Sequence, residues 1–253
     1  MYHLNINGFK SKCDSLKNVL MENRPDVIVI NEVKTVSSAF LKQYFKALGY
    51  VIIVKKEGGI VIATKPHLKL KNVTSTNHPK ILVGRIMTKE VVMRIIGVYG
   101  PQETAGIEER QEFYDELSME MEAGENPVVM GDINAKMEYC EKERVGISSN
   151  GKILNDVMMK YNLEAVNFHP ECKGKWTRVQ LKGGCVEKSV LDYILVQPSC
   201  WDKILEVEID EEKVIAPYGI TKKKRVYSDH NVIYVSLDIQ STKTEKAKKA
   251  PAQ

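Results

Sequence analysis

The stretch VYSDHNVIYV at residues 226–235 places an acid and an imidazole side by side, Asp229 and His230, next to an apolar β-branched segment. Such a segment is typical of a buried strand. Polar residues gathered at the ends of buried strands are how sheet proteins build active sites, because a rigid scaffold holds reactive side chains still. The pair therefore predicts chemistry on a phosphate, assisted by a metal ion.

Other polar residues end or follow apolar runs in the same manner: Asn5, Glu32, Asp132, Asn134 and Asp192. The runs are four to eight residues long and are bounded by Gly, Pro, Asn or Lys, which predicts buried strands. They cover Val27–Ile30, Val51–Val54, Ile60–Ala63, Ile81–Val83, Val91–Val98, Val128–Met130, Val190–Val196 and Val232–Leu237.

Helical spacing appears between some of these runs. Leu41, Tyr44, Phe45 and Leu48 share one face, with Ser37 or Ser38 as N-cap and Gly49 as the stop. Similar stripes predict helices around Leu16–Leu20, Phe113–Met121 and Ile153–Tyr161, the last capped by Ser149 or Asn150. Residues 50–98 show strands with little helix, and Gly58-Gly59 suits a hairpin turn. The pattern predicts an α/β fold in which mixed sheets are covered by helices.

The composition is that of an ordinary globular domain, with 43% hydrophobic and 28% charged residues and a net charge of +4. No apolar run approaches the roughly 20 residues that cross a bilayer, and the first residues lack a secretory core, which predicts an intracellular chain. The five cysteines form no CxxC pair, which favours free thiols. We expect one domain over residues 1–240 and a disordered basic tail or linker over 241–253.

Glu32 closes the apolar run DVIVIN, where a buried and unpaired carboxylate would cost several kcal/mol. It should be exposed, paired or bound to a cation, and Mg²⁺ prefers oxygen ligands and needs only one or two carboxylates. In VVMGDINAK (128–136), Gly131 allows a tight exit from a strand, and Asp132 and Asn134 follow two residues apart. An aspartate can orient or deprotonate an attacking water, and a carboxamide can donate to a phosphate oxygen. An Asx-turn that caps the loop is the alternative.

An imidazole near a phosphate can donate to it when a second group fixes its tautomer, and Asp192 is the candidate to orient His230. Asn5 is expected to bind the metal or to hydrogen-bond the aspartate that activates water. Tyr99 would place its hydroxyl on a phosphate oxygen, with a core tyrosine as the competing reading. The remaining candidates are small hydroxyls that would line the phosphate pocket, Thr177 and Ser189. The other four histidines, His3, His67, His78 and His169, are expected to have no role in the site.

Six motifs in order resemble those of the endonuclease/exonuclease/phosphatase superfamily: LNING (4–8), NEVK (31–34), VYGP (98–101), GDIN (131–134), LDYIL (191–195) and SDH (228–230). NGKIL (150–154), KWT (175–177) and SVLDYIL (189–195) make the chain similar to the endonuclease domains of non-LTR, LINE-type retrotransposons.

The resemblance implies a four-layer α/β sandwich, with two mixed sheets packed face to face and helices outside. It implies nicking of one strand of double-stranded DNA with Mg²⁺ or Mn²⁺, leaving a 3′-hydroxyl that primes reverse transcription. Metal ligands would be Glu32, Asn5 and Asp229, and Asp132 would orient the nucleophilic water. Phosphate contacts would come from Asn134, Tyr99 and His230. The implied partner is a reverse transcriptase domain of the same polyprotein, with no membrane involved and a nuclear location.

Two alternatives stay open. A phosphatase or phosphodiesterase of the same fold would act on inositol phosphates or sphingolipids, which calls for a concentration of Lys and Arg around the pocket. The sequence shows such a concentration only at residues 222–225. A catalytically inactive DNA-binding module is the other alternative, and the intact acid, amide and imidazole set argues against it.

Overall fold

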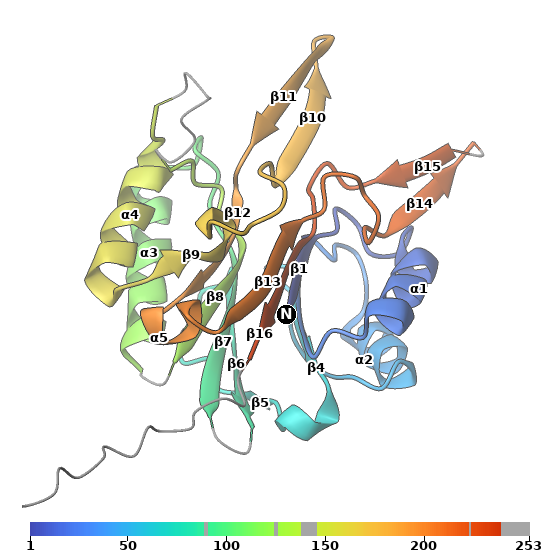
Figure 1. The fold of residues 1–253 in the computed structure, drawn as a ribbon, viewed down its shortest axis with the longest axis horizontal. Coiled ribbons are helices and arrows are strands. Elements are labelled where there is room, and N and C mark those ends of the chain that lie inside the picture. Colours follow the sequence, from blue (N-terminus) through green and yellow to red (C-terminus); the bar gives the residue numbers. More distant parts are fainter. Residues whose placement is uncertain (89–90, 124–125, 138–145, 223, 239–253) are drawn as a thin grey trace, which may run out of the picture.

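The computed structural model describes residues 1–88, 91–123, 126–137, 146–222 and 224–238. Two six-stranded sheets pack face to face, and helices cover the outer face of each (Figure 1). The four-layer α/β sandwich predicted from the sequence is confirmed. The expected disordered tail, residues 241–253, lies outside the described residues. Within them, no helix has the length and apolar content to cross a membrane.

The first sheet joins the two ends of the chain. Its central strand β1 (Tyr2–Asn5) runs parallel to β2 and antiparallel to β16, which follows the Ser-Asp-His motif. The strand order is β13-β16-β1-β2-β4-β3. The remaining strands are β2 (Val27–Asn31), β3 (Val51–Lys55), β4 (Ile60–Thr64), β13 (Ile204–Ile209) and β16 (Ile233–Leu237).

The second sheet is built from the middle of the chain and has the order β5-β6-β7-β8-β12-β9. Strand β8 (Pro127–Asp132) lies at its centre, parallel to β7 and antiparallel to β12, so that Asp132 pairs with Asp192 in register. The remaining strands are β5 (Lys71–Asn72), β6 (Ile81–Met87), β7 (Val92–Tyr99), β9 (Glu164–Ala165) and β12 (Asp192–Val196).

Helices α1 (Cys13–Asn23) and α2 (Ser38–Ala47) cover the first sheet, and α3 (Ile107–Glu122) and α4 (Ser149–Tyr161) cover the second. Ser37 caps α2, as predicted, by accepting from the Phe40 amide at 3.2 Å. The predicted cap of α4 is wrong by one residue. Ser148 is the N-cap, and its hydroxyl accepts from the Gly151 amide at 3.1 Å. Short helical segments are η1 (Pro66–Leu68), η2 (Val166–Phe168) and α5 (Pro198–Trp201).

Alternation along the strands separates the two faces of each sheet. In β2, Val27 and Val29 face the other sheet, while Ile28 and Ile30 face the helices. The same period of two carries the inner face onward to Asn31 in β2, and to Asn5 in β1. The interior between the sheets is therefore apolar over most of its length and becomes polar at one end.

Two hairpins extend from the sandwich at the same end of the molecule (Figure 1). Strands β10 (Arg178–Lys182) and β11 (Cys185–Ser189) form one, and β14 (Tyr218–Thr221) and β15 (Lys224–Tyr227) form the other. The sequence showed no strong alternation in either segment, so neither hairpin was among the predicted strands. Cys13, Cys172, Cys185 and Cys200 are free thiols, as expected, and Cys140 lies outside the described residues.

Candidate active site

The polar end of the sandwich collects side chains from strands of both sheets. Asn5 ends β1, Asp132 ends β8 and Asp192 begins β12, and all three are at most 2% exposed. Strand alternation places these side chains on the inner faces of the two sheets, as it does Met130 and Ile194 two residues away, so the fold itself directs them toward one another. The geometry brings most of the predicted site residues into one connected network.

Glu32 lies just after β2 with a left-handed backbone, φ 55°. Its Oε1 accepts from Asn5 Nδ2 at 2.8 Å and from the Tyr99 hydroxyl at 3.0 Å, and its Oε2 lies 2.9 Å from Lys34 Nζ. Partial burial opposes ionisation of Glu32, but the hydrogen bonds from Asn5 and Lys34 outweigh it and hold the pKa below its usual range. Glu32 is therefore an ionised carboxylate held in a fixed orientation.

Asp132 sits at the centre of the network. Its Oδ2 accepts from Asn5 Nδ2 at 2.9 Å, so one amide group holds the carboxylates of both Glu32 and Asp132. Its backbone N–H donates to Asn31 Oδ1 at 2.9 Å, which ties the end of β8 to the end of β2. Burial and the nearby Asp192 carboxylate raise the pKa of Asp132. A carboxylate with such a pKa is suited to accept a proton near neutral pH.

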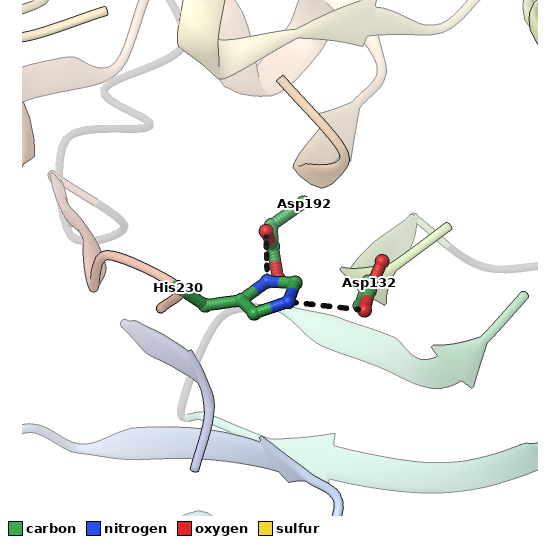
Figure 2. A group of neighbouring side chains, drawn as sticks. All are labelled: Asp132, Asp192 and His230. Carbon is green, nitrogen blue, oxygen red and sulfur yellow. Dashed lines mark hydrogen bonds and ion pairs between the residues drawn. The ribbon is translucent and has the colours of Figure 1, made fainter. Parts of the chain in front are cut away.

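His230 lies between two carboxylates (Figure 2). Its Nδ1 is 2.7 Å from Asp192 Oδ2, and its Nε2 is 3.8 Å from Asp132 Oδ2. Burial disfavours the imidazolium, but the Asp192 carboxylate outweighs burial and raises the pKa of His230 to about 9. The partner imidazoles in turn outweigh burial and lower the pKa of Asp192. The pair is thus an ionised acid with an imidazolium at neutral pH.

His3 belongs to this network, contrary to the expectation that it has no role in the site. It is fully buried on β1, with Nε2 3.1 Å from Asp192 Oδ1 and Nδ1 3.2 Å from the Val29 carbonyl oxygen. Period-two alternation places His3 on the same inner face as Asn5, two residues further along. That alternation was the signal in the sequence that would have identified it.

Two groups of side chains could hold a metal. Asp132, Asp192 and His230 offer ligand atoms within 4.8 Å of one another, but the short bond between Asp192 and His230 already uses both of these groups for each other. The alternative is the oxygen cluster around Glu32, whose side chain is 19% exposed. Carboxylate and hydroxyl oxygens of Glu32, Asp132 and Tyr99 gather there around the Asn5 amide, and a hard divalent cation prefers such oxygen donors. Asn5 turns its Nδ2 toward the two carboxylates, while its Oδ1 accepts from the Asn7 amide at 3.1 Å. These residues fit a Mg²⁺ or Mn²⁺ site, in which a bound ion would replace Lys34 as the cation on Glu32.

Asp229 lies at the rim of the network. Its Oδ2 is 2.8 Å from Arg178 Nε, and its Oδ1 is 3.5 Å from Asn7 Nδ2. Asn7 also accepts from Lys34 Nζ at 2.6 Å, so Asp229 connects to Glu32 only indirectly through the hydrogen bonds of the described residues. Burial raises the pKa of Asp229. The hydrogen bond from Arg178 and its positive charge outweigh burial and hold that pKa below its usual range.

Asn134 has φ 53° and donates through Nδ2 to the Gly100 carbonyl oxygen at 3.0 Å. Its backbone N–H donates to Asp132 Oδ1 at 3.1 Å, which is the Asx-turn considered as the alternative for this loop. The loop thus orients Asp132 through the main chain of Asn134. The amide side chain of Asn134 is half-buried beside the network.

Thr177, predicted to line the phosphate pocket, is fully buried, and its hydroxyl is engaged by the main chain. The Oγ1 accepts from the Leu191 amide at 2.8 Å and the Asp192 amide at 3.1 Å. Thr177 therefore fixes the start of β12 behind the site. Ser189 is half-buried at the base of the β10–β11 hairpin, opposite Arg178 in register.

Comparison with known proteins places these residues in a family. The profile of the Endonuclease/Exonuclease/phosphatase family matches residues 3–230. Exodeoxyribonuclease III of Haemophilus influenzae is 26% identical over 147 residues, which are 51% of this chain and 55% of that protein. The chain thus spans about half the length of this curated relative.

Solved structures share the fold over 94% of this chain and 98% of theirs. They include the endonuclease domain of TRAS1, a telomere-specific non-LTR retrotransposon (TM-score 0.69, 18% identity), and an AP endonuclease from Archaeoglobus fulgidus (TM-score 0.71, 17% identity). A 3′ phosphatase from Neisseria bound to a product DNA hairpin is similar at a TM-score of 0.70 and 19% identity. With the family profile covering the whole network from His3 to His230, the chain belongs to the Endonuclease/Exonuclease/phosphatase family.

Proposed function

We propose that this chain is a metal-dependent endonuclease that nicks one strand of double-stranded DNA and leaves a 3′-hydroxyl. The observation that carries the proposal is the position of Asp132 against the Asp192–His230 pair. A proton acceptor and an imidazolium face each other, with the closest atoms 3.8 Å apart, beside an oxygen cluster suited to a cation. Hydrolysis of a phosphodiester needs these three elements: an activated water, charge stabilisation and help for the leaving group.

Asp132 acts on the attacking water in this proposal. Asn5 and the Asn31 contact fix its carboxylate, and its raised pKa suits proton transfer near neutral pH. The Nε2 of His230 points toward the same place and donates to a non-bridging phosphate oxygen. Asp192 occupies the Nδ1 side, so the ring keeps one orientation.

Glu32, aided by Asn5, would hold Mg²⁺, with Mn²⁺ as a substitute. When bound, the ion neutralises the charge that develops on the phosphate and on the leaving oxygen. Asp229 would stay at the edge of this site, where it holds Arg178 toward the substrate side. Tyr99 donates to Glu32 and adds its hydroxyl to the pocket. Asn134 is the further proposed phosphate contact.

Double-stranded DNA is the substrate favoured by the surroundings of the site, because two hairpins with basic residues stand on the same end of the molecule. In this proposal, which draws on the resemblance to non-LTR endonuclease domains, the 3′-hydroxyl primes a reverse transcriptase domain of the same polyprotein in the nucleus. A phosphatase acting on inositol phosphates or sphingolipids is the alternative, and the cations that contact carboxylates of the network are Lys34 on Glu32 and Arg178 on Asp229.

The test is conversion of supercoiled plasmid to open circles with Mg²⁺, with EDTA and with EDTA followed by excess Mg²⁺. We expect nicking only when Mg²⁺ is present, and a reduction of roughly 10²–10⁴-fold in His230→Ala. Polymerase extension from the nick would demonstrate the 3′-hydroxyl. Persistent nicking in EDTA, or a parental rate in His230→Ala, would contradict the mechanism. Turnover of inositol phosphates without plasmid nicking would favour the alternative.

A further inference from the structure

We propose that the β14–β15 hairpin is a backbone-binding arm that grips duplex DNA beside the active site. This inference rests on the proposed function and adds to it a surface that the chemistry of the site does not use. Residues 218–227 contain four cations and no acidic residue, and the structure describes three of the cations, Lys222, Lys224 and Arg225. All three cations are exposed, and among the residues that the structure describes none of them forms an ion pair.

The hairpin is held in place by its neighbours. Gly219 lies so close to the loop before α1 that a Cβ there would be 2.8 Å from the Ser11 carbonyl oxygen. The segment that leads into the hairpin is tied down as well. The Tyr2 hydroxyl donates to the Ile215 carbonyl oxygen at 2.9 Å, and Lys213 Nζ donates to the Ser228 and His230 carbonyl oxygens at 3.0 and 2.5 Å. The arm is therefore anchored to the strand end that carries His230.

One face of the hairpin combines cation and aromatic groups. Strand register and alternation place Tyr218, Ile220, Arg225 and Tyr227 on the face opposite Gly219. The Arg225 guanidinium lies 4.5 Å from the centroid of the Tyr218 ring, which orients the guanidinium without neutralising it. Ile220 on the same face is 74% exposed. Basic groups interleaved with aromatic and apolar ones suit a nucleic-acid surface.

The position of the arm matches the dimensions of a duplex. Asp229 is the fourth residue after Arg225, so the two lie at most about 14 Å apart. A groove of B-DNA is about 6 to 12 Å wide. With a scissile phosphate at His230, the arm would reach phosphates across the groove. The β10–β11 hairpin extends from the same end of the molecule (Figure 1).

The experiment compares two triple variants of the full chain. K222Q/K224Q/R225Q removes three of the four cations of the arm and leaves Lys223. R24Q/K69Q/K71Q is the matched control, because it also removes two lysines and one arginine, all exposed, near the opposite end of the sandwich. Lys69 and Lys222 even share a left-handed backbone, with φ 49° and 46°. The affinity for a fluorescent 30-base-pair duplex is measured in EDTA at several salt concentrations.

We expect the arm variant to bind about 10-fold more weakly or worse at low salt, and its slope of log K against log salt to be shallower by about 2 to 3. The control should keep the parental slope. Equal losses in both variants, or an unchanged slope in the arm variant, would overturn the inference. Plasmid nicking by the parental chain is scored separately. If the parental chain binds the duplex but does not nick plasmid, the result contradicts the proposed function alone. If the parental chain nicks plasmid and the arm variant keeps the parental salt slope, the result contradicts the inference about the arm alone.

A different observation supports a second inference. We infer that His3 is a positioning residue that acts through Asp192 on His230, within the proposed function. Asp192 accepts from one imidazole on each carboxylate oxygen, His3 at 3.1 Å and His230 at 2.7 Å. With His3 also anchored to the Val29 carbonyl oxygen, the carboxylate cannot rotate without losing a buried contact. His3 thereby keeps Oδ2 of Asp192 on the Nδ1 of His230.

The test is His3→Leu beside His3→Gln, which restores a donor near Asp192. We expect His3→Leu to lower kcat by about 10- to 100-fold while KM stays unchanged. His3→Gln should recover part of the lost kcat. In a chain that already carries His230→Ala, His3→Leu should lower kcat no further. Leu4→Ala, on the opposite face of the same strand, controls for lost stability. Equal losses of kcat in both backgrounds, or no loss at all, would refute the inference. Proton NMR of the His230 Nδ1–H should shift in His3→Leu even if the chain proves inactive, and an unshifted resonance would also refute it.

Discussion

At the scale of single residues, the site depends on one carboxylate that is kept buried among other acids. Asp132 is 2% exposed and has Asp192 nearby, and Asn5 is the donor that makes its ionised form tolerable. Asp132→Asn conserves the shape of the side chain and removes the proton acceptor. We expect nicking to fall by roughly 10²–10⁴-fold while duplex binding in EDTA remains at the parental level. A gel assay and an anisotropy titration on the same samples check this, and a parental nicking rate would contradict the role of Asp132.

The Asp192–His230 pair predicts how stability depends on pH. The folded pKa of His230, about 9, is above the ordinary value of about 6.5, so the stabilisation is complete below about pH 6.5 and is lost as pH rises through about 9. Because the pKa of Asp132 is also raised in the folded chain, deprotonation of Asp132 lowers stability as pH rises. This loss falls at a lower pH than the loss due to His230. Urea unfolding in EDTA should therefore show a decline from pH 7 to 9.5 in the parental chain and a flatter profile in His230→Gln. Parallel profiles would show that the pair contributes no such stabilisation.

At the scale of elements, β12 depends on a hydroxyl from outside its sheet. Thr177 Oγ1 accepts from the first two amides of the β12 region, those of Leu191 and Asp192. Thr177→Val keeps the shape and leaves two buried N–H groups unsatisfied, which should cost about 1–3 kcal/mol of unfolding free energy. Thr177→Ser retains the acceptor and should cost less. Urea midpoints of the two variants measure the difference, and equal midpoints would remove Thr177 from its supporting role.

The elements also show what the sequence could predict. Strands with dense β-branched runs, such as β2 and β8, were evident because burial on both faces demands continuous apolar residues. The β10–β11 and β14–β15 hairpins were not evident in the sequence. Each is a two-stranded sheet whose exposed strands hydrogen-bond to one another, so neither strand needs an apolar pattern. In the site, motifs at strand ends identified Asn5, Glu32 and Asp132. Alternation from Asn5 could have placed His3 on the inner face of its strand. The placement of Thr177 behind Asp192 depends on a contact between distant segments, which spacing along the chain does not encode.

At the scale of the whole molecule, the sandwich concentrates its polar groups at one end of an otherwise apolar interior. Strands of both sheets contribute there, so Asn5 from one sheet and Asp132 from the other meet only when the two sheets pack. Burying several carboxylates together lowers stability, and a cation or an imidazolium offsets that cost. The site is therefore coupled to the fold, and a ligand that neutralises it should stabilise the entire domain.

That coupling predicts a response of thermal stability to Mg²⁺. A ligand at 100 times its Kd that binds only the folded chain adds about 2.7 kcal/mol of unfolding free energy. Mg²⁺ should therefore raise the Tm of the parental chain, with a dependence on concentration that gives the Kd. In Glu32→Gln the carboxylate is lost while the amide keeps the size of the side chain, so the Tm should hardly respond to Mg²⁺. Glu122→Gln, an exposed change on α3, should respond like the parental chain. Differential scanning calorimetry provides the measurement, and equal Mg²⁺ responses in Glu32→Gln and the parental chain would remove Glu32 from the metal site.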